Sequence, residues 1–211
     1  MKKYILSLAV VVAAIAIAAF TPGDIVTIAI GDAAPKADVK LSTTSGGSLA
    51  LNDVKKANGL LVVFSCNSCP FVVGSEGSDG WEGRYADLYT LATASNIGMV
   101  LLNSNEGKRT DGDSMEDMKA HAIEKGYSQI TYALDTNSEL ANAFGGRTTP
   151  HVFLFNKDMK LVYKGAIDDN VASAKEVKEP WLKNAITNLA KGVAISPAET
   201  KAIGCSIKRP K

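Results

Sequence analysis

Short apolar runs alternate with segments of helical periodicity along most of the chain. Residues 59–64 (Gly-Leu-Leu-Val-Val-Phe) and residues 97–102 are continuous runs rich in branched side chains, which is typical of strands buried on both faces of a sheet. Between these runs, the apolar positions of residues 85–94 recur at helical spacing. Strands and helices that alternate in this way predict an α/β fold.

The remaining pattern completes a sheet that is covered by helices. The other expected strands are 38–42, 48–51, 130–134, 152–156 and 161–164, and the other expected helices are 114–125, 138–144 and 180–190. Ser45-Gly46-Gly47 separates the first two strands and predicts a hairpin. Ser114 can cap its helix, and Pro180 suits the first turn of the last one. We therefore expect a central mixed β-sheet flanked by helices, with an N-terminal β-hairpin extension.

The first twenty residues differ from everything that follows. Two lysines precede an uncharged apolar run that ends at Phe20, after which proline and glycine break the pattern. This order predicts a signal peptide over residues 1–20, followed by a linker over 21–30. An uncleaved membrane anchor is the alternative, since a bilayer is spanned by about 20 apolar residues. In both cases the folded domain, expected over 31–191 with a polar tail over 192–211, is exported to the periplasm or another extracytoplasmic space.

Composition narrows the classes of function. Of the 211 residues, 46% are hydrophobic and 21% are charged, which is enough for one buried core without disulfide staples. The 23 basic and 22 acidic residues give a net charge of +1, and the basic ones are not gathered into a stripe. No nucleic-acid partner is expected. Three cysteines outside the cytoplasm tend to pair and leave one over.

Two of the cysteines form a C-x-x-C motif. Cys66 and Cys69 follow directly on strand 59–64, and Pro70 comes next. If a helix starts here, Pro70 falls in its first turn and Cys66 lies at its N-terminus, where free backbone donors lower the thiol pKa from about 8.5. A thiolate attacks disulfides, and a second thiol one turn on releases the mixed disulfide. We therefore expect Cys66 to be the nucleophile and Cys69 the resolving thiol, with no cofactor beyond their own disulfide.

Other interpretations of the motif remain open. A C-x-x-C can be half of a zinc site, but zinc needs four ligands, and the other candidates, Cys205, His121 and His151, include no second close pair. No metal is therefore expected. The pair can also be an inert disulfide in a non-enzymatic binding module, or belong to an atypical enzyme that scavenges peroxide. Disulfide exchange is the leading hypothesis, with protein thiols or disulfides and an unidentified electron donor as partners.

Five segments carry a family resemblance. They are 31–35 (G-D-A-A-P), 64–72 (F-S-C-N-S-C-P-F-V), 103–105 (N-S-N), 148–150 (T-T-P) and 203–208 (I-G-C-S-I-K). In them the chain resembles the redoxins of the alkyl hydroperoxide reductase (AhpC/TSA) type, and more specifically a peroxiredoxin-like subgroup with a C-N-x-C-P-F centre. The resemblance implies a thioredoxin-like fold and a cis Pro150 that faces Cys66 and Cys69. It also implies that the Thr149 backbone pairs with a substrate strand.

The chain departs from this family at positions that matter for chemistry. The resemblance implies a threonine three residues before a peroxidatic cysteine, but Val63 holds that position before Cys66, and Cys66 itself holds it before Cys69. Thioredoxins also carry a buried acid on the strand before the motif, and residues 60–64 offer none. Ser65 replaces the usual aromatic residue. These departures favour disulfide exchange over peroxide reduction.

Two residues outside the motif are possible accessories. Three glycines in residues 74–80 predict a break in the helix, after which Trp81 forms a substrate-facing lip or belongs to a solvated insertion. Cys205 lies in the polar tail and is either a third thiol of a relay or a free or anchoring cysteine.

Four further polar residues are expected to have ordinary roles. Solvated side chains are expected for His121 and His151, the second as a neutral surface histidine. Asp111 and Asp113 are explained best by helix capping.

Overall fold

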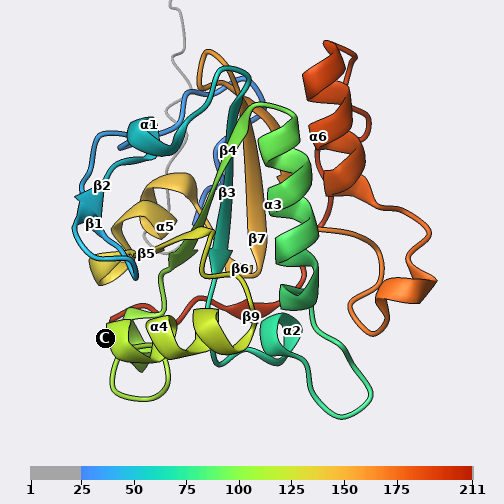
Figure 1. Ribbon diagram of the computed structural model, residues 1–211. Helices are drawn as coiled ribbons and strands as arrows, with labels where there is room; N and C mark the ends of the chain where they lie inside the picture. Colours follow the sequence, from blue (N-terminus) through green and yellow to red (C-terminus); the bar gives the residue numbers. More distant parts are fainter. Residues whose placement is uncertain (1–24, 211) are drawn as a thin grey trace, which may run out of the picture.

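A five-stranded mixed sheet runs through the middle of the molecule in the order β5-β4-β3-β7-β8 (Figure 1). The computed structural model describes residues 25–210, so the expected signal peptide lies outside the described residues. The strands are β3 Gly59–Ser65, β4 Ile97–Asn103, β5 Thr131–Leu134, β7 His151–Asn156 and β8 Leu161–Gly165. The β3, β4 and β5 strands are parallel, whereas β7 runs antiparallel to both β3 and β8. The expected mixed sheet is confirmed.

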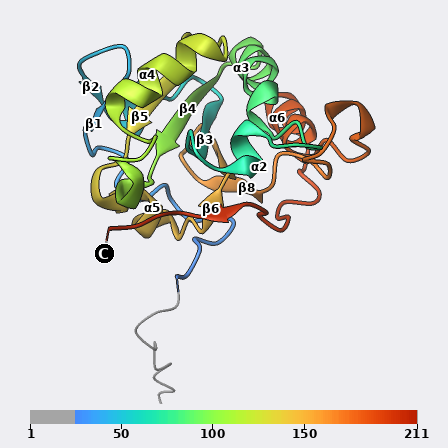
Figure 2. The same ribbon diagram turned by 90° about the horizontal axis from the view of Figure 1, so that it is seen from below.

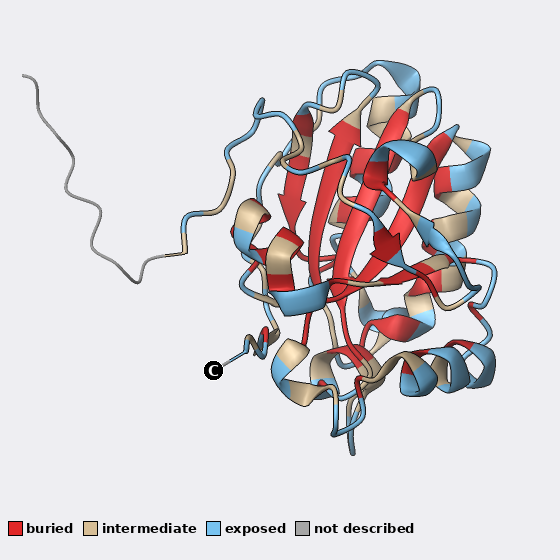
Figure 3. Ribbon diagram, turned by 90° about the vertical axis from the view of Figure 1, so that its left-hand side faces the viewer, coloured by how far each residue is buried: buried red, intermediate tan, exposed pale blue. Residues whose placement is uncertain are grey.

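The central strand β3 is buried along its whole length, as its continuous apolar sequence predicts. Its side chains alternate between two cores, with Leu61 and Val63 in one and Leu60, Val62 and Phe64 in the other. Figure 3 shows the same burial across the middle of the sheet. Each such side chain contributes on the order of 1.5–3 kcal/mol by its removal from water. The strand is therefore a fixed base for the segment that follows it.

Helices cover both faces of this sheet. They are α1 Leu51–Val54, α2 Pro70–Val73, α3 Tyr85–Ala94, α4 Met115–Glu124, α5 Glu139–Phe144 and α6 Trp181–Lys191. Single 3-10 turns occur at Glu82–Arg84, Glu106–Lys108, Thr136–Ser138 and Ala174–Glu176. Apolar residues of α3, α4 and α6 belong to the core of Leu61 and Val63, and those of α1 and α5 belong to the other core. Ser114 caps α4 as expected, since its side chain accepts from the Asp117 amide.

Two small sheets complete the fold. The expected hairpin is confirmed as β1 Leu41–Ser42 and β2 Ser48–Leu49, although it is shorter because Leu51 begins α1. The other small sheet joins β6 Thr148–Thr149 to β9 Cys205–Ser206 in antiparallel pairing. Through β9 the C-terminal segment returns across the domain and lies beside β6 (Figure 2).

Both ends of the described chain are bound to the domain. Within the expected linker, the Ile28 amide donates to the Phe144 carbonyl at 3.1 Å, and the Thr27 hydroxyl donates to the Gly145 carbonyl at 2.8 Å. Residues 25–30 therefore lie against α5 instead of acting as a free spacer.

Among the described residues, no helix combines the length and the apolar character that crossing a bilayer requires.

Candidate active site

The C-x-x-C motif lies at the end of β3, and the proline after it decides where the next helix begins. Cys69 has extended backbone angles (φ −91°, ψ 124°), and Pro70 is the first residue of α2. A residue that precedes proline is sterically disfavoured in the helical region. Cys69 is therefore the N-cap of α2, and the expectation that Cys66 lies at the helix N-terminus is wrong.

Both thiols meet the segment that contains the cis proline. The Thr149–Pro150 peptide bond is cis, as the family resemblance implies. The Cys66 Sγ lies 3.2 Å from the Thr149 Oγ1, and the Cys69 Sγ donates to the Thr149 carbonyl oxygen at 3.1 Å. The structure therefore brings together the four residues that the sequence proposes, with both cysteines present as free thiols.

A buried carboxylate holds the loop between the two cysteines. Asp113 accepts from the Asn67 amide at 2.7 Å and from the Ser68 hydroxyl at 2.7 Å. It also accepts from the side-chain amides of Asn103 at 2.7 Å and Asn105 at 3.2 Å. Asp113 therefore holds the active-site loop by hydrogen bonds and does not cap a helix. It is a buried acid that comes from the loop before α4 and not from β3.

Two further side chains fix this network, and sequence reasoning missed both. Arg109 donates to the Asn103 side-chain oxygen at 2.7 Å and to the Asp113 carbonyl at 2.8 Å. The Tyr132 hydroxyl, on β5, donates to the Asn67 side-chain oxygen at 2.9 Å. The segment 103–105 was the available signal, because its two asparagines stand at the carboxyl end of a buried strand.

The two thiols of the motif have opposite acidities. The pKa of Cys66 is raised well above its usual value by its hydrogen bond to Cys69 and by burial, with a smaller contribution from the charge of Asp113. The pKa of Cys69 is lowered to about 5, first by the hydrogen bond from Cys66 and then by those from the thiol and amide of Cys205. Cys66 is fully buried (0% exposed), whereas Cys69 is 3% exposed. Cys69 is therefore the more acidic thiol of the motif, whereas the expected roles, Cys66 as nucleophile and Cys69 as resolving thiol, stay a prediction.

The backbone of Thr149 is already paired within the chain. In the β6–β9 sheet Thr149 lies opposite Cys205, and Thr148 lies opposite Ser206. A substrate strand at this position, as the resemblance implies, would have to replace β9. A cavity of about 240 Å³ opens beside the pair; it is lined by Ser68, Cys69, Asn105, Lys108, Asp111, Cys205, Ser206 and Lys208.

Comparison with known proteins agrees with this geometry. The family model described as Redoxin matches residues 29–178. The chain belongs to the Redoxin family. A hypothetical protein from Sinorhizobium meliloti 1021 has 29% sequence identity and a TM-score of 0.76, with 87% of this chain and 96% of that chain covered. An uncharacterized conserved protein from Geobacillus kaustophilus has 30% identity and a TM-score of 0.76, with 86% and 93% covered.

More distant structures share only the fold with this redoxin. A putative thiol:disulfide interchange protein DsbE from Chlorobium tepidum is 17% identical, with a TM-score of 0.53 and with 79% of this chain and 98% of that chain covered. No curated protein matches the chain. The redoxin therefore has a thioredoxin-like α/β fold.

Trp81 of this redoxin does not form a substrate-facing lip. The expected helix break is confirmed, since α2 ends at Val73 and Gly74 follows with a positive φ of 86°. Trp81 itself is only 1% exposed, and its Nε1 donates to Asp168 Oδ1 at 2.8 Å. Arg84 pairs with the other oxygen of Asp168 at 3.0 Å. The indole is a structural anchor of the loop, so the substrate-facing lip is wrong. Residues 75–79 of the loop are mostly exposed, as expected for a solvated insertion, although Trp81 itself is buried.

The two histidines are also less exposed than expected. The His121 Nε2 lies 2.6 Å from the Glu82 Oε2, which ties α4 to the turn before α3. His151 is 4% exposed, and burial is the main cause that lowers its pKa to about 3. Its Nδ1 accepts from the Arg147 amide at 3.3 Å, so the ring is neutral but is not a surface group.

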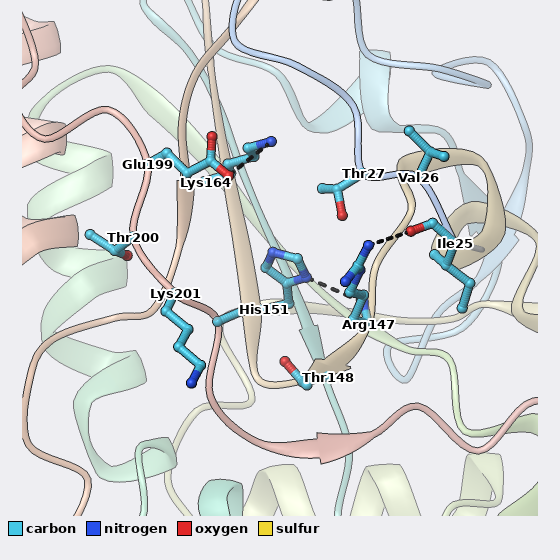
Figure 4. Close-up of a pocket in the computed structure, with 11 residues that line it drawn as sticks. Ile25, Val26, Thr27, Arg147, Thr148, His151, Lys164, Glu199, Thr200 and Lys201 are labelled. Atoms are coloured by element: carbon cyan, nitrogen blue, oxygen red, sulfur yellow. Dashed lines mark hydrogen bonds and ion pairs between the residues drawn. The ribbon is translucent and has the colours of Figure 1, made fainter. Parts of the chain in front are cut away.

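A larger cavity lies next to His151 (Figure 4), and its lining includes no cysteine. It has a volume of about 770 Å³ and is lined by Ile25, Val26, Thr27, Arg147, Thr148, His151, Lys164, Glu199, Thr200, Lys201 and Ala202. Its Lys164 Nζ pairs with Glu199 at 3.3 Å and donates to the Ile28 carbonyl at 2.9 Å. Within residues 25–210, no three His, Cys, Asp or Glu side chains are grouped as a metal site would require.

Proposed function

We propose that this redoxin is a thiol–disulfide oxidoreductase that exchanges disulfides with protein thiols through Cys66 and Cys69. The observation that carries the proposal is the contact of both sulfurs with Thr149, next to the cis peptide bond to Pro150. Membership of the Redoxin family supports it. The absence of a threonine three residues before Cys66 makes peroxide reduction the weaker alternative.

The chemistry follows from the acidity of the pair. A thiolate at Cys69 attacks one sulfur of a substrate disulfide and forms a mixed disulfide, and the first substrate sulfur leaves as a thiolate. Cys66 then attacks the Cys69 Sγ, which releases the second substrate thiol and leaves a Cys66–Cys69 disulfide. An electron donor that carries a dithiol returns the pair to its reduced form. The reverse sequence oxidises a substrate dithiol.

We place this activity outside the cytoplasm, in the periplasm or an equivalent space. The pattern of residues 1–20, with two lysines before an uncharged run, supports export. Mass measurement of the protein isolated from cells tests this placement. A start near residues 19–21 is expected for a cleaved signal peptide, whereas an intact N-terminus in the membrane fraction marks an anchor.

The reduction potential of the pair tests the proposed function. The protein is equilibrated with glutathione or dithiothreitol buffers, and the thiols are trapped and counted by mass. A potential between those of thioredoxin and protein disulfide isomerase, about −270 to −180 mV, is expected. A potential below about −300 mV would show an inert structural bridge, and with it the non-enzymatic binding module. Catalysed reduction of insulin disulfides by dithiothreitol is the matching activity assay, with Cys69→Ser as the inactive control.

A further inference from the structure

Cys205 completes a row of three sulfurs. Cys66 and Cys69 both contact Thr149, and Cys205 lies opposite Thr149 in the β6–β9 sheet. Cys69 and Cys205 also line the same cavity of about 240 Å³. The row also follows solvent access: Cys66 is 0% exposed, Cys69 is 3% exposed, and Cys205 is half-buried. Cys205 is therefore the sulfur of the three that a large partner reaches most easily.

The tail that carries Cys205 is docked along several residues. Ile207 is buried, and its amide donates to the Arg147 carbonyl at 3.0 Å. The Lys208 amide donates to the Asn105 side chain at 2.9 Å, and its carbonyl accepts from the Gly107 amide at 2.7 Å. Because Asn105 also binds Asp113, the tail is joined to the network that holds the C-x-x-C loop.

The docking places β9 so close to β6 that one position requires glycine. A Cβ atom on Gly204 would lie 2.3 Å from the Thr149 carbonyl oxygen, well inside van der Waals contact. Thr149 is the same residue whose hydroxyl and carbonyl contact Cys66 and Cys69. The close approach therefore brings the thiol of Cys205 to the reacting pair.

We infer that Cys205 is a third exchanging thiol, which takes the disulfide from the buried Cys66–Cys69 pair and presents it to partner proteins at the surface. This inference rests on the proposed function. Cys205 Sγ gives up its proton and attacks Cys69 Sγ; the Cys69–Cys205 bond forms as the Cys66–Cys69 bond breaks. Cys66 leaves as a thiolate and takes up a proton. The step is an exchange within the chain, so no electrons enter or leave.

A protein dithiol completes the reaction. One substrate thiolate attacks the half-buried Cys205 Sγ and releases Cys69 as a thiolate, which is a good leaving group because its pKa is low. The second substrate thiol then attacks the substrate sulfur of this mixed disulfide and releases Cys205. Two electrons pass from the substrate dithiol to the protein, and all three cysteines end as thiols. Since attack is at Cys205, β9 stays paired with β6 throughout.

The Cys66→Ser variant of the full chain isolates the proposed bond. It is oxidised with glutathione disulfide, trapped with N-ethylmaleimide and digested, and the peptides of Cys69 and Cys205 are sought as one cross-linked species. Their intramolecular bridge is expected as the dominant oxidised form. A matched control moves the thiol by one position, as Cys66→Ser/Cys205→Ser/Ser206→Cys, because neighbouring side chains of a strand point to opposite faces. The bridge is expected to form at least about 10-fold less readily in this control, about 1.4 kcal/mol.

Two results would overturn the inference. One is a Cys66→Ser protein that holds glutathione on Cys69 without bridging to Cys205, and the other is equal bridging in the control. A rate measurement separates this inference from the proposed function. The wild-type disulfide form oxidises a peptide dithiol, and this rate is expected to slow about 10-fold or more in Cys205→Ser, in which the Cys66–Cys69 disulfide can still form. An unchanged rate refutes the role of Cys205 alone, whereas a wild-type protein that does not exchange refutes the proposed function.

Discussion

The two sides of Cys69 are built differently. On the side of Cys66, the loop is held by Asp113 through buried hydrogen bonds that start from strand β4 and the segment before α4. On the side of Cys205, the chain is held by a two-residue strand and by bonds from the half-exposed end of the tail. The inner sulfur is therefore held by groups of the core, and the outer one by a short strand and the docked tail. The comparison teaches that one central thiol can have one neighbour fixed by the sheet and another fixed by the C-terminal tail.

Replacement of Cys69, the sulfur that both neighbours share, is expected to have the largest effect on disulfide exchange. Cys69→Ser is expected to abolish disulfide exchange, a loss of at least about 1000-fold, because neither neighbour can pair with the other across the serine. Cys66→Ser keeps the outer pair and is expected to retain measurable exchange. Turnover of a fluorescent protein disulfide compares the two variants. Equal loss in both would show that the two sides do not share Cys69.

The inner side is tested by removing its carboxylate. Asp113→Ala leaves four donors without their acceptor, among them the buried side-chain amide of Asn103. Its expected cost is about 3 kcal/mol in the free energy of unfolding, because each unsatisfied buried group costs about 1–3 kcal/mol and water reaches some of them. Urea denaturation of the reduced protein measures it. Asp111→Ala is the matched control, since that exposed carboxylate pairs only with Lys108, and it is expected to change stability by less than about 0.5 kcal/mol.

The side of Cys205 is tested by a substitution that forces strands β6 and β9 apart. Gly204→Ala is expected to push β9 away from Thr149 while global stability falls by only about 1 kcal/mol. Hydrogen exchange of residues 203–208 and alkylation of Cys205 are expected to accelerate about 10-fold. Protection that matches the wild type would show that the tail and the domain move as one unit. Gly83→Ala, at a position with free space around it and without a positive φ, serves as a control for the cost of losing glycine.

The last prediction concerns the dependence of stability on pH. The pKa of Cys69 is about 5 in the folded protein, below the value of about 8.5 for a free cysteine. A group whose pKa is lower in the folded state than in the unfolded state contributes stability that is fully present above pH 8.5 and is lost as the pH falls toward 5. The reduced wild type is therefore expected to gain stability between pH 5 and 8.5 relative to Cys69→Ser. Unfolding midpoints in urea across this range check the slope, and parallel curves would contradict the assignment.

Local patterns predicted the fold better than they predicted the site. The bounds of α3 agree with the expected 85–94, and β3 extends its expected range by one residue, because apolar periodicity depends on neighbours in the chain. Asp113, 44 residues beyond Cys69, meets the loop between the two thiols only through folding. Cys205, in the tail, meets Thr149 in the same way. No local pattern distinguishes an aspartate that caps a helix from one that binds a distant loop.

One error at the site was avoidable. The steric rule for a residue before proline is sufficient to begin the helix at Pro70, whereas the spacing of the cysteines alone points to a thiolate on Cys66. By contrast, the burial of Trp81 and His151 depends on Asp168 and on the packing of β7, which the sequence around them does not show.

The position of Pro70 offers a way to sort related sequences by their residues alone. Where proline directly follows the second cysteine of a C-x-x-C motif, helical backbone is sterically disfavoured at that cysteine, which favours a helix that begins at the proline, with the second sulfur at its end. Where proline lies elsewhere, that constraint is lifted and the first sulfur is free to take this place. The position of this proline thus divides such motifs into those with the second cysteine at the helix end and those with the first. The division predicts which cysteine an alkylating reagent modifies first.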